Sequence, residues 1–196
     1  MEILQNITKT VRMEKMNKVI VCSDRTGLLT LPLCRTLSVN GGVLYVNEGE
    51  IAEYSEGTPE FFLTDTAFPK SINARNTVIL FGADSKKLCL SDLSLFGRVI
   101  AAAVFDNAAA KNFCEKRGIP LVTYGMTKDS DIAFSSLSDE AVSLSICRPL
   151  PILPAGSTEP CEITVLHDGR IKPEILLPVC SVLILSGKIK NGCVEV

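Results

Sequence analysis

The stretch Lys18–Thr30, KVIVCSDRTGLLT, decides the fold that this sequence predicts. Its first five residues, KVIVC, form the short apolar run that is typical of a parallel strand buried on both faces. The loop Ser23–Leu29 follows, and Thr30 is placed to cap a helix whose first turn tolerates Pro32. A strand, a tight loop and a helix in this order predict the first unit of an α/β fold.

The same alternation of strands and helices continues downstream. The segment Asn47–Asn76 shows few periodic signals and is predicted as loops and short helices. Asp106 is placed to cap a helix that runs to Arg117 and stops at Gly118. Further apolar runs indicate strands at Val43–Val46, Thr77–Phe81, Arg98–Phe105 and Ile119–Tyr124. The pattern predicts a mostly parallel, P-loop-like sheet with right-handed crossovers and helices on both faces.

After Gly125 the pattern changes. Val142–Ile146 and Glu162–Leu166 alternate between apolar and polar residues, which predicts an antiparallel hairpin around a Pro-rich connection. A last helix is expected from Pro173 to Gly187, with a kink or a break at Pro178.

The expected organisation is one domain over residues 18–187. It lies between an N-terminal extension, residues 1–17, and a C-terminal tail, residues 188–196.

Composition favours a globular protein and gives little support to several partner classes. Hydrophobic residues make up 46% of the 196, and Lys+Arg number 20 against 22 Asp+Glu, so neither nucleic acid nor an anionic membrane is expected. No apolar stretch reaches the roughly 20 residues of a membrane-spanning helix. The start, MEILQNITKT, lacks the features of a secretory signal, which favours the cytoplasm. The eight cysteines include no CxxC pair, so we expect mostly buried thiols, no disulfide and no metal site.

The loop after the first strand can be compared with a Walker A loop, GxxxxGK[ST]. Gly27 matches the second glycine, and Thr30 lies one place beyond the hydroxyl position. Cys22 stands at the first glycine, Leu28 at the lysine and Leu29 at the Mg²⁺-binding hydroxyl residue. The lost lysine contact is worth about 1.5–3 kcal/mol in binding, and more in a transition state stabilised mainly by electrostatics. The sequence therefore predicts no catalytic residue.

Weak anion binding is still expected at this loop because the N-terminus of a helix favours negative charge. Asp24 opposes a bound nucleotide, and Arg25 offsets it. The candidate contacts are Asp24, Arg25, Thr26, Gly27 and Thr30, with ATP as the candidate cofactor. A plain strand-to-helix turn without phosphate binding explains the loop equally well.

Downstream, the stretch Ala103–Ile132 resembles the central domain of Mur ligases. Asp106-Asn107, Thr123-Tyr-Gly125 and Asp129-Ser-Asp131 occupy the places of that family's short motifs. The resemblance implies an ATP-binding α/β fold and adds Asn107 as a candidate cofactor contact. It also implies a relation to ligases that form amides in peptidoglycan-precursor synthesis.

The departures from that family fall on its chemistry. Gly82-Ala-Asp84 stands where a metal-binding Glu is expected, and Ile171-Lys-Pro173 replaces a His-Asn pair. The flanking ligase domains are expected to be absent. The favoured hypothesis is a non-catalytic relative that acts in binding or assembly.

Two alternatives stay open. One is an ATP-dependent amide ligase or NTPase with phosphate contacts from Arg25, Lys86 or Lys87. The other is a partition or regulator ATPase, which Gly42–Asn47 favours and the Tyr-Gly segment opposes. A homo-oligomer or a protein partner is expected near the loop and the segment Arg148–Pro160, because a domain without its neighbours exposes apolar surface.

Overall fold

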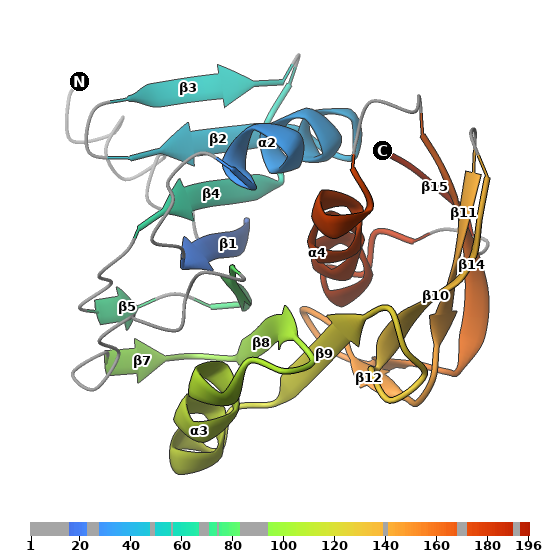
Figure 1. The fold of residues 1–196 in the computed structure, drawn as a ribbon. Helices are drawn as coiled ribbons and strands as arrows, with labels where there is room; N and C mark the ends of the chain where they lie inside the picture. The colour runs from blue at the N-terminus through green and yellow to red at the C-terminus, as the bar shows by residue number, and fades with distance from the viewer. Residues whose placement is uncertain are drawn as a thin grey trace, which may run out of the picture.

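The computed structural model describes residues 16–22, 28–47, 50–55, 57–66, 71–73, 75–82, 94–138, 141–167, 172–189 and 193–196. The elements along the chain are β1 (Asn17–Cys22), α2 (Thr30–Val39), β2 (Val43–Val46), β3 (Ile51–Tyr54), β4 (Phe61–Asp65), β5 (Ser71–Asn73), β6 (Thr77–Phe81), β7 (Ser94–Phe96), β8 (Val99–Val104), α3 (Ala108–Arg117), β9 (Leu121–Gly125), β10 (Ile132–Leu137), β11 (Ala141–Ile146), β12 (Leu150–Pro151), β13 (Ser157–Thr158), β14 (Cys161–Leu166), α4 (Pro173–Leu185) and β15 (Cys193–Glu195). One eleven-stranded sheet runs through the molecule in the order β15-β14-β11-β10-β9-β8-β6-β1-β4-β2-β3 (Figure 1).

Most neighbouring strands of this sheet are parallel. Every pair from β2 through β4, β1, β6, β8 and β9 to β10 is parallel. At one edge β3 is antiparallel to β2. Towards the other edge β10, β11 and β14 form an antiparallel set, and β15 joins β14 in parallel. The predicted parallel α/β sheet followed by an antiparallel hairpin and a helix is confirmed.

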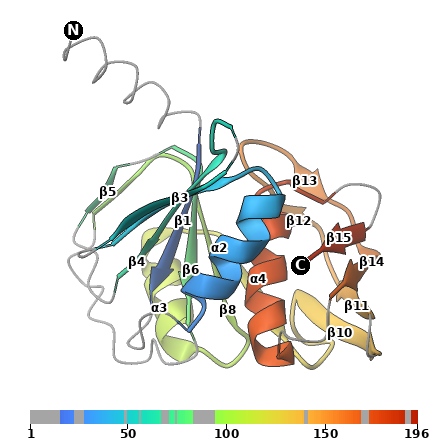
Figure 2. The same ribbon diagram turned by 90° about the horizontal axis from the view of Figure 1, so that it is seen from above.

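The helices cover both faces of the sheet (Figure 2). α2 and α4 lie on one face, and α3 lies on the other. Successive side chains of a strand point to opposite faces of the sheet, so β1 contributes side chains to the cores on both faces. Val19 and Val21 enter the larger core with α2 and α4, whereas Ile20 joins the smaller core that Phe113 of α3 completes. Burial on both sides is why KVIVC is apolar nearly throughout.

α4 passes through the larger core, and its side chains from Leu176 to Ser186 are buried. Pro173 opens it, and Gly187 follows its end with φ +65°. The break considered at Pro178 is wrong, because the helix runs unbroken from Pro173 to Leu185. The carbonyl that this proline leaves without its helical partner belongs to Glu174, in an exposed first turn that water can reach.

Several strands lie where the sequence predicted none. The segment Asn47–Asn76 contains β3, β4 and β5, so the expectation of loops and short helices there is wrong. β4 is an inner strand of the main sheet and lies between β1 and β2. β10 begins at Ile132, and β15 adds a strand within residues 188–196, which were expected to form a tail.

The described cysteines lie mostly in strands of the main sheet and in the helices that cover it. Among the cysteines that the structure describes, Cys22, Cys34, Cys114 and Cys180 are free and buried, and Cys147 and Cys161 are free and exposed. Within the described ranges, no helix is long and apolar enough to cross a membrane.

Candidate functional site

Three parallel strands end side by side in front of α2. Val21 of β1 is in register with Asp65 of β4, and Cys22 is in register with Phe81 of β6. Backbone hydrogen bonds extend this alignment past the strand ends, since Thr66 N–H donates to the Val21 carbonyl at 2.9 Å. Ligands of open α/β sheets bind at the carboxyl ends of the strands. This edge is therefore the candidate site.

A buried hydroxyl–carboxylate pair lies at this edge. The hydroxyl of Thr30 donates to Oδ2 of Asp65 at 2.6 Å, and the two residues are 3% and 8% exposed. Thr30 is therefore the first residue of α2 and not its cap. The cap position falls to Leu29, which makes no side-chain hydrogen bond there. The predicted cap is wrong because the carboxylate of β4 takes up the hydroxyl.

The two positions that would carry phosphate chemistry hold apolar side chains. Leu28 is 54% exposed at the start of α2, and Leu29 is 7% exposed within the larger core. The other sequence-predicted contacts in this loop, Asp24, Arg25, Thr26 and Gly27, lie outside the described residues.

The residues that the structure describes here supply only part of a Mg²⁺ site. Mg²⁺ requires near-octahedral oxygen coordination, and P-loop enzymes supply a hydroxyl together with an acidic side chain. Thr30 and Asp65 are one such pair, with the hydroxyl donating to Oδ2, and Leu29 adds no side-chain oxygen. Across the described ranges, no three His, Cys, Asp or Glu side chains form a metal cluster.

Neither Cys22, at the end of β1, nor Tyr124, near the end of β9, is suited to nucleophilic chemistry. Burial, together with the nearby Asp65 carboxylate, raises the pKa of the Cys22 thiol to about 12. Burial also raises the pKa of the Tyr124 hydroxyl, which donates to the Phe81 carbonyl at 3.2 Å. Both groups stay protonated at neutral pH, and Tyr124 ties the end of β9 to the end of β6.

Asn107 has a clear structural role. Its Oδ1 accepts from the N–H of Ala110 at 3.0 Å, so this fully buried residue caps α3. The predicted capping by Asp106 is wrong, because that residue is exposed one position before the cap. The predicted stop at Gly118 is confirmed by its left-handed φ of +62°. Nucleotide binding by Asn107 stays a prediction.

The Tyr-Gly motif depends on a close approach between two segments. A Cβ at Gly125 would lie 2.5 Å from Oγ of Ser130, so only glycine fits there without a shift. The Ser130 hydroxyl is buried and has no partner among the described residues. Gly125 thus allows Ser130 to pack closely against the end of β9.

Asp131 anchors the same turn. Its Oδ2 accepts from the N–H of Thr123 at 2.7 Å and from the Thr123 hydroxyl at 3.0 Å. Arg148 binds the carboxylate with Nη2, at 2.8 Å from Oδ2, and with Nε on Oδ1. Asp131 is only 5% exposed, and these four contacts compensate for its burial. Sequence analysis missed Arg148 because nothing local links it to Asp131.

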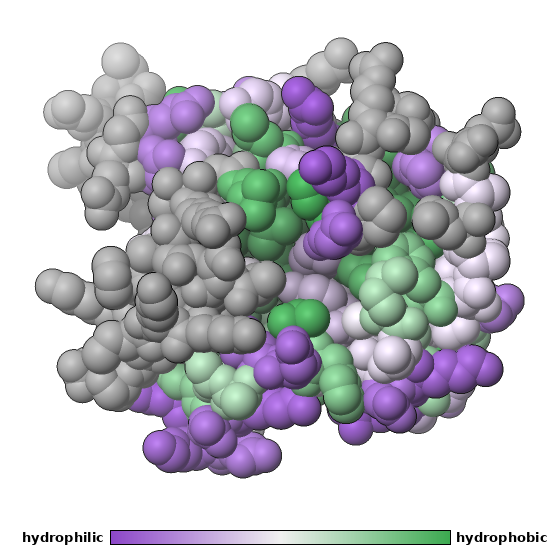
Figure 3. Space-filling view, viewed as in Figure 1, coloured by the Kyte–Doolittle hydropathy of each residue, from purple (hydrophilic) through white to green (hydrophobic). Residues whose placement is uncertain are grey.

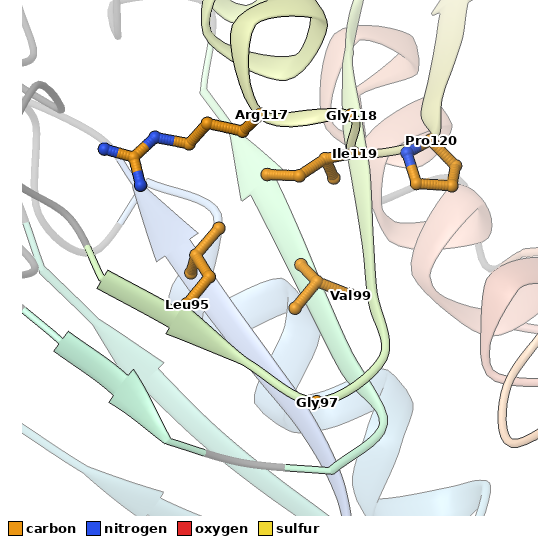
Figure 4. Close-up of a pocket in the computed structure, with 7 residues that line it drawn as sticks. All are labelled: Leu95, Gly97, Val99, Arg117, Gly118, Ile119 and Pro120. Atoms are coloured by element: carbon orange, nitrogen blue, oxygen red, sulfur yellow. The ribbon is translucent and has the colours of Figure 1, made fainter.

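The pockets that the structure describes lie away from the Thr30–Asp65 pair. Beside α3 a groove of about 520 Å³ includes Lys111, Glu115, Asp131 and Arg148. A smaller pocket of about 330 Å³ lies at the C-terminal end of α3, where Leu95, Val99 and Ile119 point toward one another (Figure 4). Neither pocket includes Thr30 or Asp65.

Comparison with solved structures identifies the fold. No protein-family model matches the sequence, and no curated protein matches it. Similar structures include MurF ligase from Thermotoga maritima in complex with ADP, with 13% identity, a TM-score of 0.55, and coverage of 96% of this chain and 50% of that one. UDP-N-acetylmuramoyl-L-alanyl-D-glutamate–2,6-diaminopimelate ligase shows 10% identity, a TM-score of 0.55, and coverage of 94% and 45%.

A third similar structure is UDP-N-acetylmuramate:L-alanyl-γ-D-glutamyl-meso-diaminopimelate ligase from Neisseria meningitidis. It shows 9% identity, a TM-score of 0.51, and coverage of 92% of this chain and 64% of that one. The chain thus spans less than two thirds of each of these ligases. Its fold is that of Mur ligases.

Proposed function

We propose that this chain is a cytoplasmic, non-catalytic protein of the Mur-ligase fold that acts by binding or assembly. The observation that carries the proposal is the pair of leucines at the start of α2. Leu28 replaces the lysine that would neutralise the β- and γ-phosphates, and Leu29 turns into the core. Phosphoryl transfer relies on such charges, so their loss removes the main source of catalysis.

Weak binding of a nucleotide or another anion is part of the proposal. The N-terminus of α2 has no side-chain cap, so its backbone N–H groups and dipole still favour negative charge. The buried Asp65 carboxylate nearby opposes that charge. Apolar side chains also reach the surface on the face that carries α2, which suits protein contacts (Figure 3).

Leu28→Lys tests whether the loop has phosphate-binding geometry. Leu28 is exposed, so the variant should fold, and the added ammonium should raise ATP affinity about ten- to hundredfold. Leu31→Lys is the matched control, since Leu31 is 60% exposed and lies three positions later, in the first turn of α2. Calorimetry or thermal shift with ATP and Mg²⁺ provides the measurement. Equal gains for both variants would reject a phosphate-binding loop.

Hydrolysis separates the proposal from its enzymatic alternative. We expect ATP turnover at background, both alone and with UDP-sugar peptides of the kind named for the similar ligases. Mg²⁺-dependent turnover that disappears in Arg25→Ala would instead support the ATP-dependent ligase or NTPase.

A further inference from the structure

A hollow of about 650 Å³ lies between the end of α2 and the end of β3. Gly41, Gly42 and Gly57 line it, and they leave it open because they carry no side chains. Two apolar side chains border it, since Val39 is 72% exposed and Tyr54 is 41% exposed. Uncovered apolar side chains around a hollow mark a contact surface.

The chain enters the main sheet in the same row of residues as this hollow. Asn17, the first residue of β1, is in register with Phe61 of β4. Phe61 is in register with Val43 of β2, which lies opposite Tyr54 of β3 (Figure 1). Neighbouring strands are about 4.8 Å apart, so three steps along this row lead from Asn17 to the hollow over about 15 Å.

Residues 1–15, MEILQNITKTVRMEK, precede this row and lie outside the described residues. An α-helix turns by about 100° per residue, and on such a helix their aliphatic side chains fall within about 100° of arc. These side chains are Ile3, Leu4, Ile7 and Val11. Ile7 lies ten positions before Asn17, which is about 15 Å along a helix and matches the distance to the hollow.

The two regions also carry opposite charge. Residues 47–60, which contain β3, include five Glu and neither Lys nor Arg. Residues 1–15 have an excess of basic side chains, with Lys9, Arg12 and Lys15 against Glu2 and Glu14. A second copy of this acidic surface, or an anionic membrane, would be repelled from the hollow, whereas residues 1–15 are attracted to it.

We propose that residues 1–15 form an amphipathic helix that lies across the starts of β4 and β2 and covers the hollow with its aliphatic side chains. The attachment at Asn17 holds this segment at a local concentration in the millimolar range, an advantage that no separate partner has. The inference goes beyond the proposed function. Hydrolysis measurements test catalysis and fluorescence tests the docked helix, so either can fail alone.

A single indole reports the position of the helix, because the chain contains no tryptophan. In Ile7→Trp the indole faces the hollow, so acrylamide should quench its fluorescence several-fold less than in the urea-unfolded variant. Gln5→Trp is the matched control, since position 5 lies on the opposite side of the same helix. Its indole should be quenched as strongly as in the unfolded chain. Equal quenching of the two folded variants would overturn the inference.

Val39→Lys tests the surface that the helix covers. Val39 is exposed, so the variant should fold, and its ammonium should repel the basic segment. Added to Ile7→Trp, it should restore quenching to the unfolded level. Met126→Lys, at a 67% exposed position outside the hollow, should leave the quenching unchanged. Protection of the indole that survives Val39→Lys would overturn the inference.

The same fluorescence measurement identifies other occupants. We expect the protection in Ile7→Trp to be the same from low to high micromolar protein and without added lipid. Protection that appears only at high protein concentration would assign the segment to a second copy of the chain. Protection that appears only with vesicles of anionic phospholipid would assign it to a membrane surface. Either result would overturn the inference.

Discussion

Arg148→Ala and Asp131→Ala together test how the turn between β9 and β10 is held. The side chain of Asp131 is 7% exposed, whereas that of Arg148 is 60% exposed, so the two partners lose unequal amounts of hydration on pairing. The carboxylate also accepts the N–H and the hydroxyl of Thr123, at 2.7 and 3.0 Å. The structure therefore predicts unequal costs for the two truncations.

The magnitudes follow from what each variant leaves behind. Removing one partner of a fully buried ion pair costs about 3–5 kcal/mol. In Arg148→Ala, water reaches the vacated position and Thr123 still donates twice, so we expect about 1–2 kcal/mol. Asp131→Ala also leaves the Thr123 N–H without its acceptor, and we expect about 2–4 kcal/mol. Thr123→Val removes the hydroxyl that donates to Oδ2 and accepts from the Asp131 N–H at 3.2 Å, and should cost about 1–3 kcal/mol.

Urea unfolding measures the loss in the free energy of unfolding of each variant, because the midpoint shifts while the m-value stays constant. Lys128→Ala is the control, because Lys128 is exposed in the same loop. The double variant Asp131→Ala/Arg148→Ala should cost less than the sum of the single variants. The reasoning is refuted if Arg148→Ala costs more than Asp131→Ala, or if both match Lys128→Ala.

Gly125→Ala should lower the free energy of unfolding by about 1–3 kcal/mol, because the new Cβ falls 2.5 Å from Oγ of Ser130. Adding Ser130→Gly should recover part of that loss in urea unfolding, and no recovery would contradict the contact. Burial raises the pKa of Cys22, Cys114 and Cys180 from 9.0 to about 12, so the native state keeps protons that the unfolded chain releases. The free energy of unfolding that these buried thiols contribute should be present below pH 9.0 and should fall as the pH rises toward about 12. The fall should be less steep in Cys180→Ala. A urea midpoint that stays constant over this pH interval would exclude the effect.

The sequence predicted the parallel strands because burial on both faces leaves a continuous apolar run. Lys18–Cys22 and Thr77–Phe81 show this pattern and became β1 and β6. The sequence did not predict β4, although it pairs directly with β1 in the same sheet. Its residues Phe61, Leu63 and Asp65 are buried in alternation with half-buried Phe62 and Thr64, so its apolar run is interrupted.

Because the sequence does not predict β4, it also does not predict the Thr30–Asp65 pair of the candidate site. Thr30 and Asp65 are 35 positions apart, and they meet only because β4 inserts between β1 and β2. No local signal specifies that insertion. Capping propensity favoured Thr30 as an N-cap, but the buried carboxylate required a donor and the hydroxyl supplied it. A tertiary contact thus overrode the local preference.

The motifs that carry the resemblance to Mur ligases serve the fold in this chain. Tyr124 bonds to the end of β6, Gly125 admits the hydroxyl of Ser130, and Asp131 fixes Thr123. None of these contacts requires a phosphate. The departures, by contrast, include Leu28 and Leu29, where phosphate and Mg²⁺ would be held, together with Gly82-Ala-Asp84 and Ile171-Lys-Pro173. Sequence likeness over Ala103–Ile132 is therefore an argument for the fold, and these contacts by themselves are no argument for ATP chemistry.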